Sequence, residues 1–194
     1  MSSCCIVAGM YPTFQKSAAT LAIALSIGTV SSCSPAPKTA EDWQQQGIIQ
    51  TQNGNLDEAI KSFDQAVLLE ADSATTLVNR GLVRDELGDH EGAIADYSQA
   101  IALEPTLTAA YYNRANAYHN LGQYEKSIDS YTQAIAQEAD FAYAYVNRAI
   151  NHEMLGNIEP AIQDLSHALS LFEADEDTEN AERITTKLDE LQPR

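Results

Sequence analysis

The sequence predicts an all-α fold, a right-handed solenoid of stacked helix pairs, and three observations support this prediction. Four blocks of 34 residues follow one another without a gap, at 40–73, 74–107, 108–141 and 142–175. Small and large residues recur at fixed positions in these blocks, and every block has glycine at its fifteenth position. A unit that repeats at this period cannot bury its apolar face alone, so neighbouring units stack.

Each block reads as two helices joined by a short turn. The glycine at position 15 ends the first helix, and Asn55, Asp89 and Asn157 follow it as N-caps of a second helix in three of the four blocks. Glu58 lies three residues after Asn55, which is the spacing of a capping box. The four glycines are Gly54, Gly88, Gly122 and Gly156.

Residue size within the blocks indicates how the helices pack. Small residues at positions 8, 20 and 27 let two helices approach closely, and large residues at positions 4 and 24 fill the space beside them. Position 4 holds Trp43, Leu77, Tyr111 and Tyr145, and position 24 holds Phe63, Tyr97, Tyr131 and Leu165. Over residues 40–175 this pattern resembles the tetratricopeptide repeat (TPR). The resemblance implies four helix-turn-helix repeats with a concave and a convex side.

Position 11 departs from the pattern of that family, which usually has an aromatic residue there. Only Tyr118 keeps it, and Gln50, Arg84 and His152 replace it on the buried stripe of their helices. These polar side chains must therefore find partners or extend to solvent.

The segment 176–194 is predicted to form a capping helix and tail that cover the end of the stack. Ile184, Leu188 and Leu191 recur at helical spacing, with acidic residues early and Lys187 late. The alternative is a disordered acidic tail, but the regular apolar stripe favours the helix.

The first 32 residues resemble a bacterial lipoprotein signal peptide. Lys16 precedes an apolar run at 18–30 that is too short to span a bilayer, and Val30, Ser31, Ser32 and Cys33 resemble a lipobox. Met10 then offers a more compact start. The resemblance implies that Cys33 is acylated, that 33–39 is a flexible tether, and that the folded part lies in the periplasm on the cell envelope. In a Gram-negative host it implies the outer membrane. The alternative is a lone cysteine in an ordinary secretory signal or in an uncleaved tail.

The composition argues against several classes of function. Eleven Lys and Arg against 28 Asp and Glu give a net charge of −17, which disfavours nucleic acid as a partner. All three cysteines lie within the first 33 residues, so the rest of the chain has no thiolate metal site. Phosphate-binding, zinc-binding and nucleophile motifs are absent from the sequence. We therefore expect no enzyme activity, metal or cofactor.

The asparagines of the first helices suggest a peptide-binding groove. A helical wheel places Asn113, Asn116 and Asn120 opposite the core, on the face that is concave in a tetratricopeptide superhelix. Position 6 forms a ladder of side-chain amides, and four apolar or aromatic residues should border it. The ladder comprises Gln45, Asn79, Asn113 and Asn147, and the bordering residues are Val78, Tyr112, Tyr143 and Val146. Such amides can pair with the peptide groups of an extended chain.

The expected ligand of the groove is an extended segment of neutral to basic character. The resemblance adds that asparagine ladders bind peptides in this family; the alternative is that these polar residues are simply solvated. Position 7 carries Arg80, Arg114 and Arg148, which we assign to packing between repeats, with carboxylates such as Asp64 and Asp96 as partners. The resemblance to the family also argues against a carboxylate clamp for chaperone tails, because that clamp needs Lys or Arg at positions 2 and 5 of the blocks, which hold no cation here.

The sequence therefore predicts an adaptor for protein–protein interaction at the bacterial envelope, held to the membrane by its N-terminal lipid. The alternative is a structural scaffold of an envelope assembly that associates with its own copies.

Overall fold

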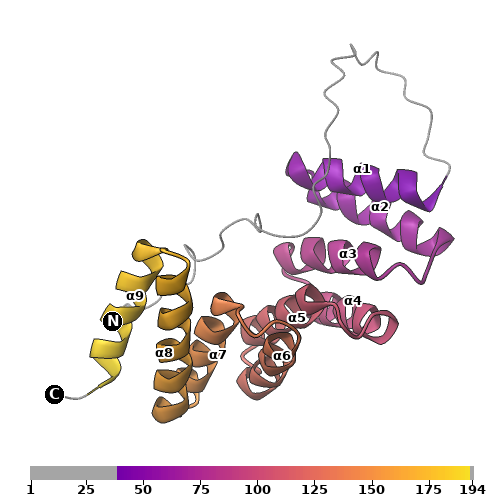
Figure 1. Ribbon diagram of the computed structural model, residues 1–194. Helices are drawn as coiled ribbons and strands as arrows, with labels where there is room; N and C mark the ends of the chain where they lie inside the picture. The colour runs from indigo at the N-terminus through magenta and orange to yellow at the C-terminus, as the bar shows by residue number, and fades with distance from the viewer. Residues whose placement is uncertain (1–38, 193–194) are drawn as a thin grey trace. The chain divides into compact units, whose positions relative to one another are not determined.

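The computed structural model describes residues 39–192, and within this part of the chain it has nine α-helices and no strand (Figure 1). The all-α prediction is confirmed. The helices are α1 Ala40–Gln52, α2 Leu56–Leu69, α3 Ala74–Glu86, α4 His90–Leu103, α5 Thr108–Asn120, α6 Tyr124–Gln137, α7 Ala142–Met154, α8 Ile158–Ala174 and α9 Thr178–Leu191. The predicted signal peptide at 1–32 and the lipidation site Cys33 lie outside the described residues.

The helices form a stack in which each packs against the next in the chain. The four pairs are α1 with α2, α3 with α4, α5 with α6, and α7 with α8. The second helix of each pair also packs against the first helix of the following pair, and α9 packs against α8 (Figure 1). The predicted capping helix is therefore present, with Ile184 buried on its inner side. This arrangement is that of a solenoid.

Small residues allow the close packing within each pair. The alanines at positions 20 and 27 are fully buried where they occur, and large side chains lie between the helices beside them. Gly81 shows how tight this contact is, because a Cβ atom there would lie 2.6 Å from the ring of Tyr97. Gly47 lies against the ring of Phe63 in the same way. The small and large residues that recur in the sequence thus correspond to close contacts between the paired helices.

The turns between paired helices depend on glycine. Gly54, Gly88, Gly122 and Gly156 have φ angles between 69° and 84°, a region that glycine enters without steric cost. The N-caps are less regular than predicted. The Asp89 carboxylate accepts a hydrogen bond from the Gly92 amide, but the side chains of Asn55 and Asn157 form no capping bond.

The predicted capping box at Asn55 and Glu58 is wrong, because Glu58 pairs with Lys61 at 2.7 Å instead. A capping box is found one helix earlier. There the Thr39 hydroxyl accepts from the Asp42 amide and the Asp42 carboxylate accepts from the Thr39 amide. The first turn of α1 is therefore fixed by reciprocal bonds.

Two of the three polar residues at position 11 find partners. Gln50 accepts a hydrogen bond from Ser62, and Arg84 donates to Asp96. His152 differs, since its Nδ1 is buried and has no hydrogen-bond partner among residues 39–192. The prediction that these side chains find partners or extend to solvent is therefore wrong for Nδ1 of His152. Burial lowers the pKa of His152 below its ordinary value.

The N-terminal end of the stack has no covering helix among the described residues. Position 10 is buried in the later pairs, where it is occupied by Val83, Ala117 and Asn151. In the first pair the same position is Ile49, whose side chain is 48% exposed. Among the described residues, the solenoid is thus capped by α9 and has no cap at α1.

Candidate functional site

The arginines at position 7 lie between helices, as predicted, and link three helices each. Arg80 of α3 donates two hydrogen bonds to Asp96 of α4, at 2.9 and 2.6 Å, and a third to Asp64 of α2 at 2.9 Å. Arg148 of α7 forms the same bidentate pair with Asp164, at 2.8 and 2.7 Å. Bidentate geometry makes these pairs strong and orients the guanidinium groups toward the second helices.

Arg114 occupies the same position but has no carboxylate partner among residues 39–192. Its guanidinium donates to the hydroxyls of Ser130 and Ser98, at 3.2 and 3.4 Å, and lies 5.6 Å from the centre of the Tyr111 ring. The assignment to packing holds for all three arginines, but the expected carboxylate is present only for Arg80 and Arg148.

The first helices of the pairs consequently present no free cation on their other face. Arg80, Arg84, Arg114 and Arg148 are the only Lys or Arg residues of α1, α3, α5 and α7, and their polar partners lie on the second helices or in the turn before them. Glu86 remains exposed at the end of α3 without an ion-pair partner in the described chain. Any ligand on this face therefore meets negative or neutral groups.

We call this surface the amide face, after the ladder residues Gln45, Asn79, Asn113 and Asn147. Gln45 is exposed and the three asparagines are half-buried. Within residues 39–192, the side chains of Gln45, Asn79 and Asn113 form no hydrogen bond. Asn147 is engaged, because its Nδ2 donates to the Tyr112 hydroxyl at 2.9 Å. Three of the four amides thus have both donor and acceptor available.

Asn116 does not lie on the amide face, and its predicted orientation is wrong. It is only 8% exposed, and its Oδ1 accepts a hydrogen bond from the Tyr131 hydroxyl of α6. The helical wheel treats α5 alone and omits this side chain, which reaches across from the paired helix. Asn116 is therefore a structural residue, whereas Asn120 is exposed as expected.

The predicted apolar border of the ladder lies mainly in the core. Val78 and Val146 are 8% and 3% exposed, so neither presents a surface to a ligand. Tyr112 is half-buried against Tyr131 and Phe141, with ring centres 5.6 and 4.7 Å apart. Tyr143 of α7 is also half-buried, packs on Phe172, and accepts a hydrogen bond from Asn180 of α9. These tyrosines join successive helix pairs more than they line an open surface.

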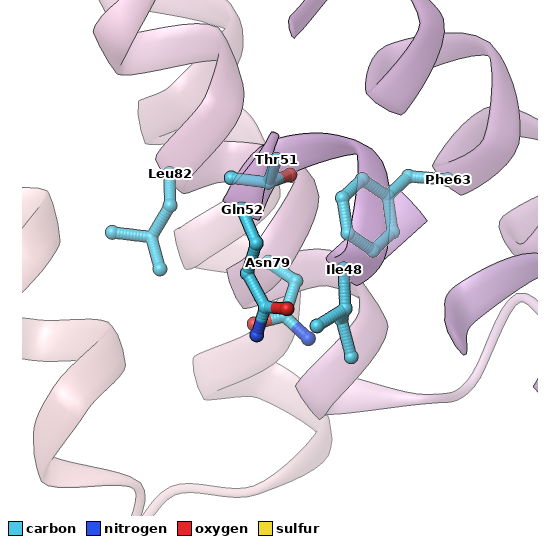
Figure 2. A pocket seen from close by; sticks show the side chains of 6 residues that line it. All are labelled: Ile48, Thr51, Gln52, Phe63, Asn79 and Leu82. Atoms are coloured by element: carbon cyan, nitrogen blue, oxygen red, sulfur yellow. The ribbon is translucent and has the colours of Figure 1, made fainter. Parts of the chain in front are cut away.

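A pocket that was not predicted from the sequence lies at the N-terminal end of the amide face. It has a volume of about 170 Å³ and lies where α1, α2 and α3 meet (Figure 2). Its lining residues are Ile48, Thr51, Gln52, Phe63, Asn79 and Leu82. One signal for it was present in the sequence: Phe63 is the aromatic residue without a hydroxyl at a position that holds tyrosine in the next two blocks.

The described residues show neither a metal site nor a membrane-spanning segment. From Thr39 to Gln192, no group of three or more His, Cys, Asp or Glu side chains is arranged to hold a metal ion. In the same range no helix combines the length and apolarity needed to cross a membrane.

The helix pairs, their glycine turns and the small residues between them define a solenoid of the tetratricopeptide type. Family comparisons agree with this class. Residues 41–73 and 108–141 each match a model of the tetratricopeptide repeat, and residues 86–122 match a further TPR repeat model. Tetratricopeptide repeats are therefore recognised in this chain.

Solved structures of similar fold include a crystal structure of MamA, which is 25% identical with a TM-score of 0.71 and covers 73% of this chain and 83% of that one. MamA 41-end from Desulfovibrio magneticus RS-1 is 18% identical, with a TM-score of 0.66 and coverage of 80% and 96%. The first TPR of Spaghetti (RPAP3), bound to the HSP90 peptide SRMEEVD, is 22% identical, with a TM-score of 0.60 and coverage of 61% and 94%. No curated protein sequence matches the chain.

Proposed function

We propose that this protein is a non-enzymatic adaptor whose amide face binds an extended segment of a partner protein. The observation that carries the proposal is the row of unengaged amides at Gln45, Asn79 and Asn113. A primary amide donates and accepts at once, so such a row pairs with successive peptide groups whatever side chains the ligand carries. Asparagine also costs helix stability relative to alanine, so its recurrence on a surface needs a reason.

Charge selects the kind of segment. The arginines of the first helices are engaged with the second helices, and the amide face keeps Glu86 unpaired. A neutral or basic segment fits this field, and an acidic one is repelled. The RPAP3 domain of similar fold is bound to a peptide with three acidic residues. We therefore extend peptide binding to this chain as a class of activity, with a ligand of different charge.

The amide face is tested by substituting its free amides in the full chain. Asn79→Ala combined with Asn113→Ala should reduce partner capture in a cross-linked pull-down from the native envelope, read by mass spectrometry. Gln65→Ala with Gln133→Ala is the matched control, since both residues are exposed on second helices. Circular dichroism should be unchanged in all variants because alanine favours helix. Equal capture by both double variants would reject the proposal and leave the amides as solvated side chains.

We place the adaptor at the bacterial cell envelope, anchored by lipid on Cys33. The support is the order of Lys16, the apolar run at 18–30 and Cys33 in the sequence. Cys33→Ala should abolish metabolic labelling by a fatty-acid probe, whereas Cys4→Ala with Cys5→Ala should leave labelling in place. Labelling that persists without Cys33 would contradict the anchor.

Self-association as a structural scaffold is the second candidate, and the open end of the stack favours it. Ile49 is 48% exposed at a position that later pairs bury. If copies join through this end, the protein should run as an oligomer in size-exclusion chromatography with light scattering. Ile49→Lys should then give monomers. A wild-type monomer would exclude the scaffold.

A further inference from the structure

We propose that the pocket between α1 and α3 is the anchor of the amide face: it takes one aliphatic or phenyl side chain of the bound segment, next to a lysine or arginine of that segment. This inference rests on the proposed function and adds the side chains by which the ligand is chosen. Peptide groups alone give affinity without selectivity, so an adaptor with a preferred partner needs such a subsite.

Size and lining fit an apolar side chain. The pocket has a volume of about 170 Å³ and is open to solvent, so it offers room for part of one aliphatic or phenyl side chain. Ile48, Leu82 and the ring of Phe63 supply its apolar wall (Figure 2). Leu82 is 43% exposed at the mouth, so a ligand group that covers it removes apolar surface from water.

The equivalent place in the third helix pair has a different chemical lining. There Tyr131 replaces Phe63 and Asn116 replaces Ile48, each offset by two blocks of the repeat. The Tyr131 hydroxyl donates to Asn116, so that place is lined by a hydrogen-bonded polar pair. In the first pair both groups are apolar, so no such bond forms and an apolar ligand group meets an apolar wall.

The pocket also provides the polar groups that hold a peptide backbone. Asn79 and Gln52 both line it, and neither side chain forms a hydrogen bond within residues 39–192. The third polar residue, Thr51, is already engaged because its hydroxyl donates to the Gly47 carbonyl at 2.9 Å. Two free amides beside an apolar wall suit a side chain that enters with its own peptide groups flanking it.

The charge beside the pocket selects a cation. Glu86 lies one helical turn after Leu82 on α3, on the same stripe of the helix. It is exposed and has no ion-pair partner in the described chain. The arginines of α3 are held by Asp64 and Asp96 on the far side, so they do not neutralise it. A basic residue next to the anchor therefore gains attraction and meets no competing cation.

The test uses the full chain with ¹³C-labelled Ile and Leu methyl groups, titrated with capped six-residue peptides. The peptides are Gly-Ser-Leu-Lys-Ser-Gly and its variants with Ala-Lys or Leu-Glu in the middle. The Leu-Lys peptide should shift the methyl signals of Ile48 and Leu82. Replacing leucine by alanine should weaken binding about tenfold, because most of the apolar contact is lost. Replacing lysine by glutamate should weaken it several-fold.

Two protein variants introduce into the pocket the residue types that hold the same block positions in the third pair, Tyr131 and Asn116. Phe63→Tyr directs a hydroxyl at Ile48, as Tyr131 does at Asn116, and Leu82→Asn removes the apolar mouth. Each should weaken binding of the Leu-Lys peptide about tenfold, because Phe63→Tyr leaves a buried hydroxyl unpaired and Leu82→Asn removes apolar contact with the ligand. Leu103→Asn is the matched control, since Leu103 is also 43% exposed but lies on α4 away from the pocket. It should bind as the wild type does.

Three results would overturn the proposal. The first is a Leu-Lys peptide that causes no shift, and the second is unchanged peptide affinity in both pocket variants. The third is a shift of Ile48 and Leu82 that depends on protein concentration without peptide, which would assign the pocket to a second copy. If native partner capture still depends on Asn79 and Asn113 in these cases, the amide face stands and only the anchor fails. If capture is independent of them, the proposed function fails as well.

Discussion

Two tyrosine hydroxyls at the same position of successive helix pairs have different environments. The Tyr131 hydroxyl donates to Asn116, whereas the Tyr97 hydroxyl is buried with no partner among residues 39–192. Burial also raises the pKa of Tyr97 well above its ordinary value. An unpaired buried hydroxyl costs stability, and a paired one contributes.

We therefore expect opposite effects from the same substitution. Tyr97→Phe should raise the free energy of unfolding by about 1 kcal/mol, because the unsatisfied group is removed. Tyr131→Phe should lower it by about 1–2 kcal/mol, because the Asn116 oxygen loses its donor in the core. Urea denaturation followed by circular dichroism measures both. The wild type is the control for both variants. A change in the free energy of unfolding of the same sign and size in both would contradict the different environments of the two hydroxyls.

His152 makes the stability depend on pH in a direction that its environment fixes. Desolvation lowers its pKa in the folded state, so the unfolded chain takes up the proton first as pH falls. The contribution of neutral His152 is thus complete above an ordinary pKa of about 6.5 and is lost as pH falls below it. His152→Tyr, which matches Tyr118 at the same position of the preceding block, should reduce the loss of stability between about pH 7.5 and pH 5.5. Denaturation midpoints at both pH values measure it, and an unchanged difference would contradict the prediction.

The packing of α5 against α6 differs from that of its neighbours by one missing charge. Asp96 and Asp164 receive Arg80 and Arg148, but the equivalent residue on α6 is Ser130. Ser130→Asp should restore a bidentate pair with Arg114 and raise the free energy of unfolding by about 1 kcal/mol, the net value of a charge-assisted bond after desolvation. In an Arg114→Ala background the same substitution should destabilise the fold, because a buried carboxylate then lacks its partner. A higher free energy of unfolding in both backgrounds would show that the pair of Arg114 with the carboxylate introduced at position 130 is not the cause of the stabilisation.

Where helices end could be predicted more reliably than how they begin. The glycines Gly54, Gly88, Gly122 and Gly156 end their helices because few other residues adopt positive φ. An N-cap depends on a side-chain rotamer, and several partners compete for it. Asp89 caps its helix, whereas Asn55 does not and Glu58 turns to Lys61. The period of the repeat constrains the backbone. Local polar contacts depend on which of several neighbouring side chains forms the bond, and the sequence does not show which one does.

The amide face, too, could be predicted from the sequence only in part. The row of amides follows from the repeat and the helical wheel, which fix where Gln45, Asn79 and Asn113 point. Asn116 was assigned wrongly because the group that buries it, the Tyr131 hydroxyl, belongs to another helix. The pocket was missed for a related reason, since its lining comes from three helices. The position of a residue on its own helix predicts the direction of its side chain. Whether that side chain is buried depends on the helices packed beside it.

At the scale of the whole molecule, charge is distributed unevenly around the solenoid. The arginines of the first helices form ion pairs and hydrogen bonds with the second helices, and Glu86 remains without an ion-pair partner on the amide face of the described chain. The chain as a whole carries −17. Such a field attracts a basic ligand over a distance of about 10 Å at 0.1 M salt, whereas the apolar pocket acts only on contact. The association rate of the ligand should thus depend on charge and salt, and its dissociation rate on the apolar contact.

We expect the association rate of the Leu-Lys peptide to fall about tenfold when salt rises from about 50 mM to about 500 mM, with little change in the dissociation rate. Replacing leucine by alanine in the peptide should raise the dissociation rate and leave the association rate nearly unchanged, because it removes apolar contact and keeps the charge. Stopped-flow fluorescence of a labelled peptide measures both rates. Glu86→Gln should reduce the salt dependence, whereas Glu159→Gln, an exposed carboxylate on α8, should have a smaller effect because it lies far from the pocket. Salt dependence confined to the dissociation rate would mean that the charge acts in the bound complex, as a contact, and not in steering the encounter.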